Sequence, residues 1–283
     1  MPVLRSTAIF LVCGIVLFAT LPAMAQKEQD VRALVQSVVN NELEKDTNDH
    51  SKWMYRDINK QHGTTTDKLV VQTAEGDLSK TIEIDGHPLT QQQKQQNQAK
   101  MRRFVTDPAV RAKQKQSNKQ DDQKAASLTR MLPDAFLWAK VSQNGDEMTL
   151  AFRPNPKFSP PTRDARVFAA MQGKMVVNTK EKRIQSLKGR LTRNVDFGWG
   201  LLGKLQKGGT FDVERREIGD GVWEITETHV HIHGHALIFK SISEDQDEET
   251  SDYHQTPPST TLQSAEKMLE DGEVAKDLGV KLP

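Results

Sequence analysis

The sequence predicts an α+β protein in which a curved antiparallel β-sheet, a half-barrel, is covered by an N-terminal helix and a helical insertion. About nine or ten segments have the composition of strands and are separated by turn residues. These segments do not alternate with helices, which argues against a parallel sheet. Helical patterns occur near the N-terminus and between residues 90 and 132. We therefore expect one half-barrel domain over residues 26–256, with a helical insertion at 90–132. Residues 257–283 are expected to form a tail with a short helix.

The first 25 residues have the layout of a secretory signal peptide. Arg5 precedes an apolar run from Ala8 to Ala19, and Ala23-Met24-Ala25 forms a small-x-small cleavage site. The apolar run is short for a membrane span. The single cysteine, Cys13, lies inside this segment and away from the cleavage point, where a lipid-attachment cysteine would stand. We expect export to the periplasm and a mature chain without disulfides or thiol chemistry.

The next segments read as one helix followed by a meander. Apolar residues recur at helical spacing between about Lys27 and Lys45, which predicts one buried helix face. Three strand-like segments follow, around Trp53–Ile58, Leu69–Thr73 and Thr81–Ile84, with polar linkers between them. Neighbouring strands joined by short linkers favour antiparallel pairing.

The insertion from Thr90 to Leu132 is rich in Gln and Lys. Asp107-Pro108 can start its second helix, because proline suits the first helical turn. Ten Lys/Arg face three Asp between Thr90 and Arg130, whereas residues 243–259 hold six acids and no Lys or Arg. Both can be plain solvated segments, or the basic segment can contact anionic lipid or an acidic partner. The whole chain has 39 Lys/Arg and 38 Asp/Glu, so charge gives nucleic-acid binding no support.

Strand-like sequence resumes after the insertion. Asn144-Gly145 predicts a hairpin between residues 135–141 and 147–152. Four prolines between Pro154 and Pro161 exclude regular structure there. Residues 166–178 and 183–195 read as a second hairpin. The segment 197–209 reads as a glycine-rich loop. Residues 210–218 and 222–242 read as further strands, and 262–269 as a short helix.

Four histidines form the sharpest local pattern, at a spacing of two: His229, His231, His233 and His235. On one continuous strand all four would project from the same face, where neutral imidazoles suit zinc, copper or nickel. A turn at Gly234 would split the set. The alternative is the polar face of a sheet whose other face carries Val230 and Ile232, and this alternative predicts no metal.

No sequence motif indicates an enzyme or a bound cofactor. The glycine-rich segment 197–204 lacks the Gly-Lys-Ser/Thr ending of a phosphate loop, and neither Gly-x-Ser-x-Gly nor His-Glu-x-x-His occurs. Large apolar residues are most simply core, but a cavity would turn some of them into ligand contacts. The candidates are Trp138, Phe152, Phe168, Met171, Trp199, Leu201 and Trp223.

Scattered residues carry a family resemblance between Ser51 and Gln255. They are Phe152-Arg153-Pro154-Asn155-Pro156, Pro160-Pro161-Thr162, Val167-Phe168-x-x-Met171-x-Gly173, Phe197-Gly198 and Ala236-Leu237-Ile238-Phe239-Lys240. In these stretches the chain resembles exported bacterial proteins that are themselves similar to the outer-membrane lipoprotein carriers and the lipoprotein-sorting superfamily. The resemblance implies an unclosed antiparallel barrel, capped by helices, with an apolar cavity inside.

Together these observations favour a non-enzymatic periplasmic protein that binds an acyl chain, a lipid or a lipoprotein-like amphiphile. Burial contributes about 0.8 kcal/mol per CH2, so such a protein needs a dry cavity and a movable cover rather than catalytic residues. An envelope sensor or scaffold that binds a protein partner is the second possibility. A metal-binding or hydrolytic protein is the third.

Overall fold

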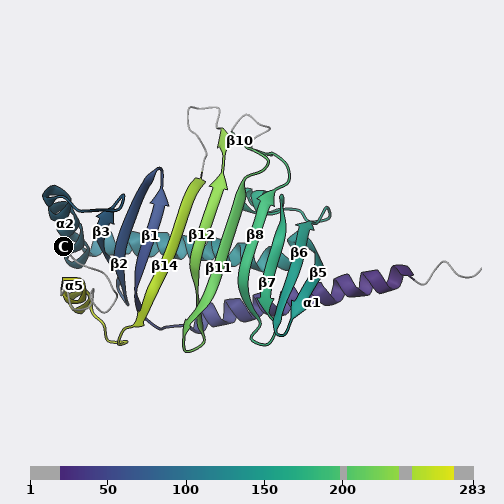
Figure 1. The fold of residues 1–283 in the computed structure, drawn as a ribbon, viewed down its shortest axis with the longest axis horizontal. Coiled ribbons are helices and arrows are strands. Elements are labelled where there is room, and N and C mark those ends of the chain that lie inside the picture. The colour runs from purple at the N-terminus through teal and green to yellow at the C-terminus, as the bar shows by residue number, and fades with distance from the viewer. Residues whose placement is uncertain (1–19, 198–202, 236–243, 271–283) are drawn as a thin grey trace, which may run out of the picture.

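The computed structural model describes residues 20–197, 203–235 and 244–270 (Figure 1). The protein is α+β, with a large antiparallel sheet of 11 strands that does not close into a barrel and is covered by helices. The helices are α1 (Thr20–Asn48), α2 (Gln91–Thr106), α3 (Pro108–Ala135), α4 (Arg163–Phe168) and α5 (Leu262–Glu270). The first half of the strands comprises β1 (Trp53–Gln61), β2 (Thr64–Thr73), β3 (Gly76–Ile84), β4 (His87–Pro88), β5 (Phe136–Asn144), β6 (Glu147–Pro154) and β7 (Met171–Asn178). The second half comprises β8 (Arg183–Leu191), β9 (Val195–Phe197), β10 (Gly203–Leu205), β11 (Thr210–Gly219), β12 (Val222–Ile232), β13 (Gly234–His235) and β14 (Glu244–Gln255).

The strand order shows how the two ends of the chain meet. It runs β4-β3-β2-β1-β14-β12-β11-β8-β7-β6-β5, and β9, β10 and β13 form a separate three-stranded sheet. The last strand, β14, lies between β1 and β12 in the middle of the large sheet. Sequence analysis assigned no strand to this acidic segment, and that interpretation is wrong. Acidic residues have low strand propensity, but packing against cross-strand partners overrides it here.

The N-terminal helix has the buried face that its periodicity predicts. Val35, Val38 and Val39 on α1 have no exposed surface. The helix continues to Asn48, beyond the expected end at Lys45. Of the predicted signal peptide, residues 1–19 lie outside the described part of the chain, and so does the tail beyond residue 270. No helix in the described ranges combines the length and hydropathy that a membrane span requires.

The insertion is helical, as predicted, but only the ends of α3 are packed. The Asp107 side chain accepts a hydrogen bond from the Ala109 amide and caps α3, and Pro108 occupies the first turn. Near the start of α3, Gln114 hydrogen-bonds the backbone of Asp77 on β3. Near its end, Leu132 is buried and its carbonyl accepts a bond from the Trp138 indole. Every residue from Lys115 to Ala125 is exposed. The helix therefore crosses behind the sheet from the β3 side to the β5 side (Figure 1) and is held at its two ends.

Two hydrophobic cores lie on opposite faces of the large sheet. The larger core joins α1 and the end of α3 to β5–β8 and includes Phe136, Trp138, Leu150 and Met175. The second core joins α2 and α5 to β1–β3 and includes Met54. Met54 and its neighbour Tyr55 point to opposite faces of β1, because side chains alternate along a strand.

Two local expectations change in the structure. Residues 166–168 do not start a strand, because Thr162 caps the short helix α4 by accepting a bond from the Ala165 amide. Phe168 therefore lies on a helix. The strand expected over residues 222–242 ends at Ile232, and residues 236–243 lie outside the described ranges. The Asn144-Gly145 hairpin is confirmed, and so is the irregular proline-rich segment, except that Pro154 is the last residue of β6.

Candidate functional site

Along one row of the core-side face, the side chains change from apolar to polar at strand β12. Residues directly opposite each other on antiparallel strands share a face, so a row of side chains can be followed across the sheet. From β7 to β1 this row is Met175, Leu187, Val213, Thr228, Glu248 and Asn59. Met175 is fully buried in the larger core. The same face therefore continues that core into a polar region over β12, β14 and β1.

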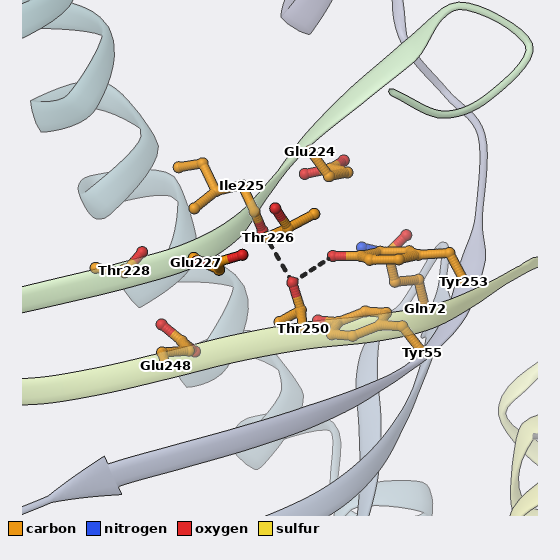
Figure 2. Close-up of a pocket in the computed structure, with 10 residues that line it drawn as sticks. All are labelled: Tyr55, Gln72, Glu224, Ile225, Thr226, Glu227, Thr228, Glu248, Thr250 and Tyr253. Carbon is orange, nitrogen blue, oxygen red and sulfur yellow. Dashed lines mark hydrogen bonds between the residues drawn. The ribbon is translucent and has the colours of Figure 1, made fainter. Parts of the chain in front are cut away.

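A pocket of about 200 Å³ lies in this polar region. Its lining comes from four strands that are distant in the sequence, namely β1, β2, β12 and β14 (Figure 2). The lining residues are Tyr55, Gln72, Glu224, Ile225, Thr226, Glu227, Thr228, Glu248, Thr250 and Tyr253. Three of these are glutamates and none is basic. Glu227 is paired with Arg216, so Glu224 and Glu248 give the pocket its negative charge.

Two stacked tyrosines border the pocket. The ring centroids of Tyr55 and Tyr253 lie 5.1 Å apart with an angle of 18° between the planes. The Tyr253 hydroxyl donates a 2.7 Å hydrogen bond to Thr250 Oγ1, and the Thr250 hydroxyl donates to the carbonyl of Ile225 (Figure 2). Burial raises the pKa of Tyr253 to about 12 and raises the pKa of Tyr55 further. Both phenols are therefore neutral at physiological pH.

Two carboxylates of the pocket lack a basic partner. Within the described part of the chain, no Lys or Arg side chain forms an ion pair with Glu224 or Glu248. The nearby cations serve other acids, since Lys68 pairs with Asp57 at 3.3 Å and Arg215 binds Glu42. Burial raises the pKa of Glu224 and of Glu248, and the Asp57 charge adds to the shift at Glu248.

Among the residues that the structure describes, the hydroxyl of Thr226 has no hydrogen-bond partner. The residue is only 7% exposed and its Oγ1 is buried in the wall of the pocket. A buried hydroxyl without a partner costs about 1–3 kcal/mol, so such groups usually face water or a ligand.

The ligand-binding residues predicted from the sequence lie elsewhere. Trp138, Phe152 and Met171 are buried in the larger core, and Phe168 is partly buried against it. Their aromatic rings contact one another through Phe136, with centroids 4.7 Å from Phe152 and 5.0 Å from Phe168. None of the predicted residues that the structure describes lines the pocket above or the shallow hollow beside α1 that contains Gln36 and Lys182.

The remaining predicted residues are separated from this aromatic cluster. Trp223 is buried on β12, under the guanidinium of Arg183 at 5.7 Å. Trp199 and Leu201 lie outside the described residues. Sequence reasoning missed the pocket because its lining is polar and comes from both ends of the chain. The only local signal in the described strands is Tyr253, which lies on the acid-rich strand β14.

The histidine set is split, and its first two members face acids. His229 and His231 lie on β12, His233 follows the strand, and β13 carries His235 into the small sheet. His229 Nδ1 lies 2.7 Å from Asp247 Oδ1, and His231 Nδ1 lies 2.5 Å from Asp245 Oδ1. Their side chains are 43% and 41% exposed. The described residues contain no group of three or more His, Cys, Asp or Glu side chains placed to hold a metal ion.

These histidines belong to a charged row on the face opposite the pocket. From β8 to β1 this row is Lys188, Asp212, His229, Asp247 and Lys60. Lys188 Nζ lies 3.0 Å from Asp212 Oδ2. The alternating charges account for the acidic run of β14, whose odd-numbered acids Asp245 and Asp247 pair with the histidines while Glu248 faces the pocket.

No protein-family model matches this chain, and neither a curated protein nor a solved structure does so.

Proposed function

We propose that this is an exported, non-enzymatic binding protein of the periplasm that holds an acyl chain or another amphiphile between its sheet and α3. The observation that carries the proposal is the change from Val213 to Thr228 and Glu248 along one face of the sheet. A surface that is apolar on one side and polar on the other matches a ligand with an apolar chain and a polar head. The proposal agrees with the resemblance to the lipoprotein carriers.

The dimensions of α3 support a half-barrel that curves towards this helix. A helix rises about 1.5 Å per residue, so the part between Gln114 and Leu132 is about 27 Å long. Strands lie about 4.8 Å apart, so the nine steps from β3 to β5 amount to about 43 Å along the sheet. A helix of this length that contacts both ends supports a sheet that bends or twists around it, with α3 as a chord across the concave face.

The exposed middle of α3 suits a movable cover. Eleven consecutive residues, from Lys115 to Ala125, are exposed on every side of the helix, so no packed core has to be broken when this part moves. An amphiphile could enter beneath it and place its chain along Leu187 and Phe211. These two residues are only partly buried at the margin of the larger core. Trp138, Phe152 and Met171, predicted as ligand contacts, would then support this surface from behind.

The basic side chains of the insertion would bind the protein to a membrane during ligand transfer. Lys115, Lys119 and Lys124 are exposed on α3, and Arg102 and Arg103 are exposed on α2. Clustered basic residues near anionic head groups gain about 1 kcal/mol each. We propose that this surface brings the carrier to anionic lipid, where α3 lifts and the ligand transfers.

The test uses the protein purified from the compartment to which it is exported. Native mass spectrometry should find a lipid or lipoprotein fragment, and a fluorescent fatty-acid probe should bind and be displaced by decanol. Val213→Glu, which places a charge on the apolar margin, should weaken probe binding. Asp212→Glu, one residue away on the opposite face, should not. Absence of any bound lipid together with absence of probe binding would reject the proposal.

A milder variant distinguishes weaker probe binding from misfolding. Val213→Thr keeps the shape of the side chain and adds one hydroxyl. It should weaken the probe less than Val213→Glu, in a protein whose thermal unfolding is close to that of the original chain. Unchanged probe binding in both variants would show that the acyl chain does not contact Val213.

A further inference from the structure

The pocket over β12, β14 and β1 has a size that restricts its occupant. Pockets for drug-sized ligands measure about 300–1,000 Å³. This pocket measures about 200 Å³, which suits a small head group and excludes a whole lipid. It also lies on the same face as the apolar margin, because Thr228 and Val213 are direct cross-strand partners.

The negative charge of the pocket favours a cationic ligand. Glu224 and Glu248 face a cavity whose described lining contains no Lys, Arg or His. Burying a carboxylate is costly unless it is paired. Here the neighbouring bases, Lys68 and Arg215, are already bound to other acids. Glu248 accepts a 3.1 Å hydrogen bond from Gln246 Nε2, but no described Lys or Arg forms an ion pair with either glutamate, and a cationic ligand would supply that charge.

Two tyrosines and a threonine offer further contacts to a cationic ligand. An ammonium group is attracted to the face of an aromatic ring within about 6 Å of its centroid. Tyr55 and Tyr253 lie at the border of the cavity (Figure 2), where each ring covers one face of the other and the outer ring faces remain for such a contact. The buried hydroxyl of Thr226 has no partner within the described structure and can bond a ligand hydroxyl or N–H group. This hydroxyl is an observation independent of the acidic charge.

We propose that this pocket binds an alkylammonium group, with Glu248 and Glu224 balancing its charge, the tyrosines beside it and Thr226 bonding a hydroxyl or N–H of the ligand. The inference rests on the proposed function in one respect, since it makes the ammonium group the head of the carried amphiphile. A phosphate next to the ammonium would meet the same carboxylates and be repelled. The ligand class is therefore a cationic amphiphile or a free amine, rather than a zwitterionic phospholipid.

The experiment compares choline with 3,3-dimethyl-1-butanol, which has the same shape and a carbon in place of the charged nitrogen. Isothermal titration of the full protein should show choline binding and much weaker binding of the neutral alcohol. Glu248→Gln should weaken choline binding by about tenfold or more, the loss of one charge-assisted contact. Glu249→Gln is the matched control, because Glu249 is the next residue on β14 and is exposed on the opposite face.

A second variant separates a binding effect from a folding effect. Thr226→Val keeps the shape and removes the hydroxyl, so it should weaken choline binding severalfold without lowering the unfolding temperature. Equal binding of choline and the neutral alcohol would overturn the inference. So would equal effects of Glu248→Gln and Glu249→Gln.

Further titrations distinguish the source of the ligand and keep the two proposals apart. Decyltrimethylammonium that binds far more tightly than choline indicates a cationic amphiphile, whereas equal affinities indicate a free amine. If decanol binds and choline does not, the amphiphile proposal stands and the ammonium site is wrong. If choline binds and no apolar probe does, the ammonium site stands and the carrier proposal is wrong.

Discussion

Glu42 on α1 and Arg183 on β8 form an ion pair inside the protein. Arg183 Nη2 lies 3.0 Å from Glu42 Oε2, and the two side chains are 4% and 2% exposed. Glu42 also accepts hydrogen bonds of 2.5 Å from the Ile184 amide and from Arg215 Nη1. One buried carboxylate therefore ties the N-terminal helix to two strands, β8 and β11, beside the polar pocket.

Removing this carboxylate should destabilise the whole protein. Glu42→Ala is expected to lower the free energy of unfolding by about 3–5 kcal/mol, because it leaves the buried guanidinium of Arg183 without its counter-charge and leaves Arg215 with only Asp46, at 3.5 Å. Urea unfolding followed by circular dichroism measures the change. Glu44→Ala, at an exposed position of the same helix, should have little effect. A loss below about 1 kcal/mol in Glu42→Ala would show that water reaches the ion pair.

The open edge of β3 is closed by two amide side chains. Asn97 on α2 bonds both the N–H and the carbonyl of Thr81, and Gln114 on α3 does the same for Asp77. Asn97→Ala with Gln114→Ala should cost about 1 kcal/mol for each amide and leave backbone groups ready to pair with another chain. Light scattering should detect self-association at high concentration. The control, Gln95→Ala with Gln116→Ala, changes exposed amides and should remain unaffected.

The polar pocket should make the unliganded protein less stable at neutral pH. Burial raises the pKa of Glu248 above its usual value of 4.5, so the unfolded chain releases this proton more readily than the folded one. The free energy of unfolding therefore falls as the pH rises from 4.5 to the raised pKa of Glu248. Above that pKa this carboxyl causes no further loss of stability. Glu248→Gln should be more stable than the original protein at pH 7 and equal to it at pH 3.5. Unfolding temperatures across this range test the difference. A constant offset at every pH would contradict the pKa shift.

The aromatic core should not accept a larger side chain. Met171 is 6% exposed among Phe136, Trp138 and Phe152. Met171→Trp is expected to cost about 1–3 kcal/mol through overpacking, as measured by urea unfolding. Gln172→Trp, whose side chain points to the other face, is the control. If Met171→Trp kept full stability and lost acyl-probe binding, the ligand cavity would lie at Met171, as the sequence alone suggested.

The sequence by itself determined the elements that depend on local pattern. The apolar stripe at Val35, Val38 and Val39 marks the buried face of α1, and Asn144-Gly145 marks a hairpin, because both signals lie within a few neighbouring residues. Asp107-Pro108 marks the start of α3 for the same reason. The absence of strand-helix alternation correctly indicated an antiparallel sheet.

Only the tertiary structure decided which strands became neighbours. β14 has no apolar alternation, and its place between β1 and β12 depends on cross-strand partners far away in the sequence. The pocket follows from that placement, since Tyr55 and Tyr253 come from opposite ends of the chain and meet only when β14 closes the middle of the sheet. The same pairing sends Asp247 to the histidines and Glu248 to the pocket. A strand alternates its side chains between two faces, and composition alone does not say what covers each face.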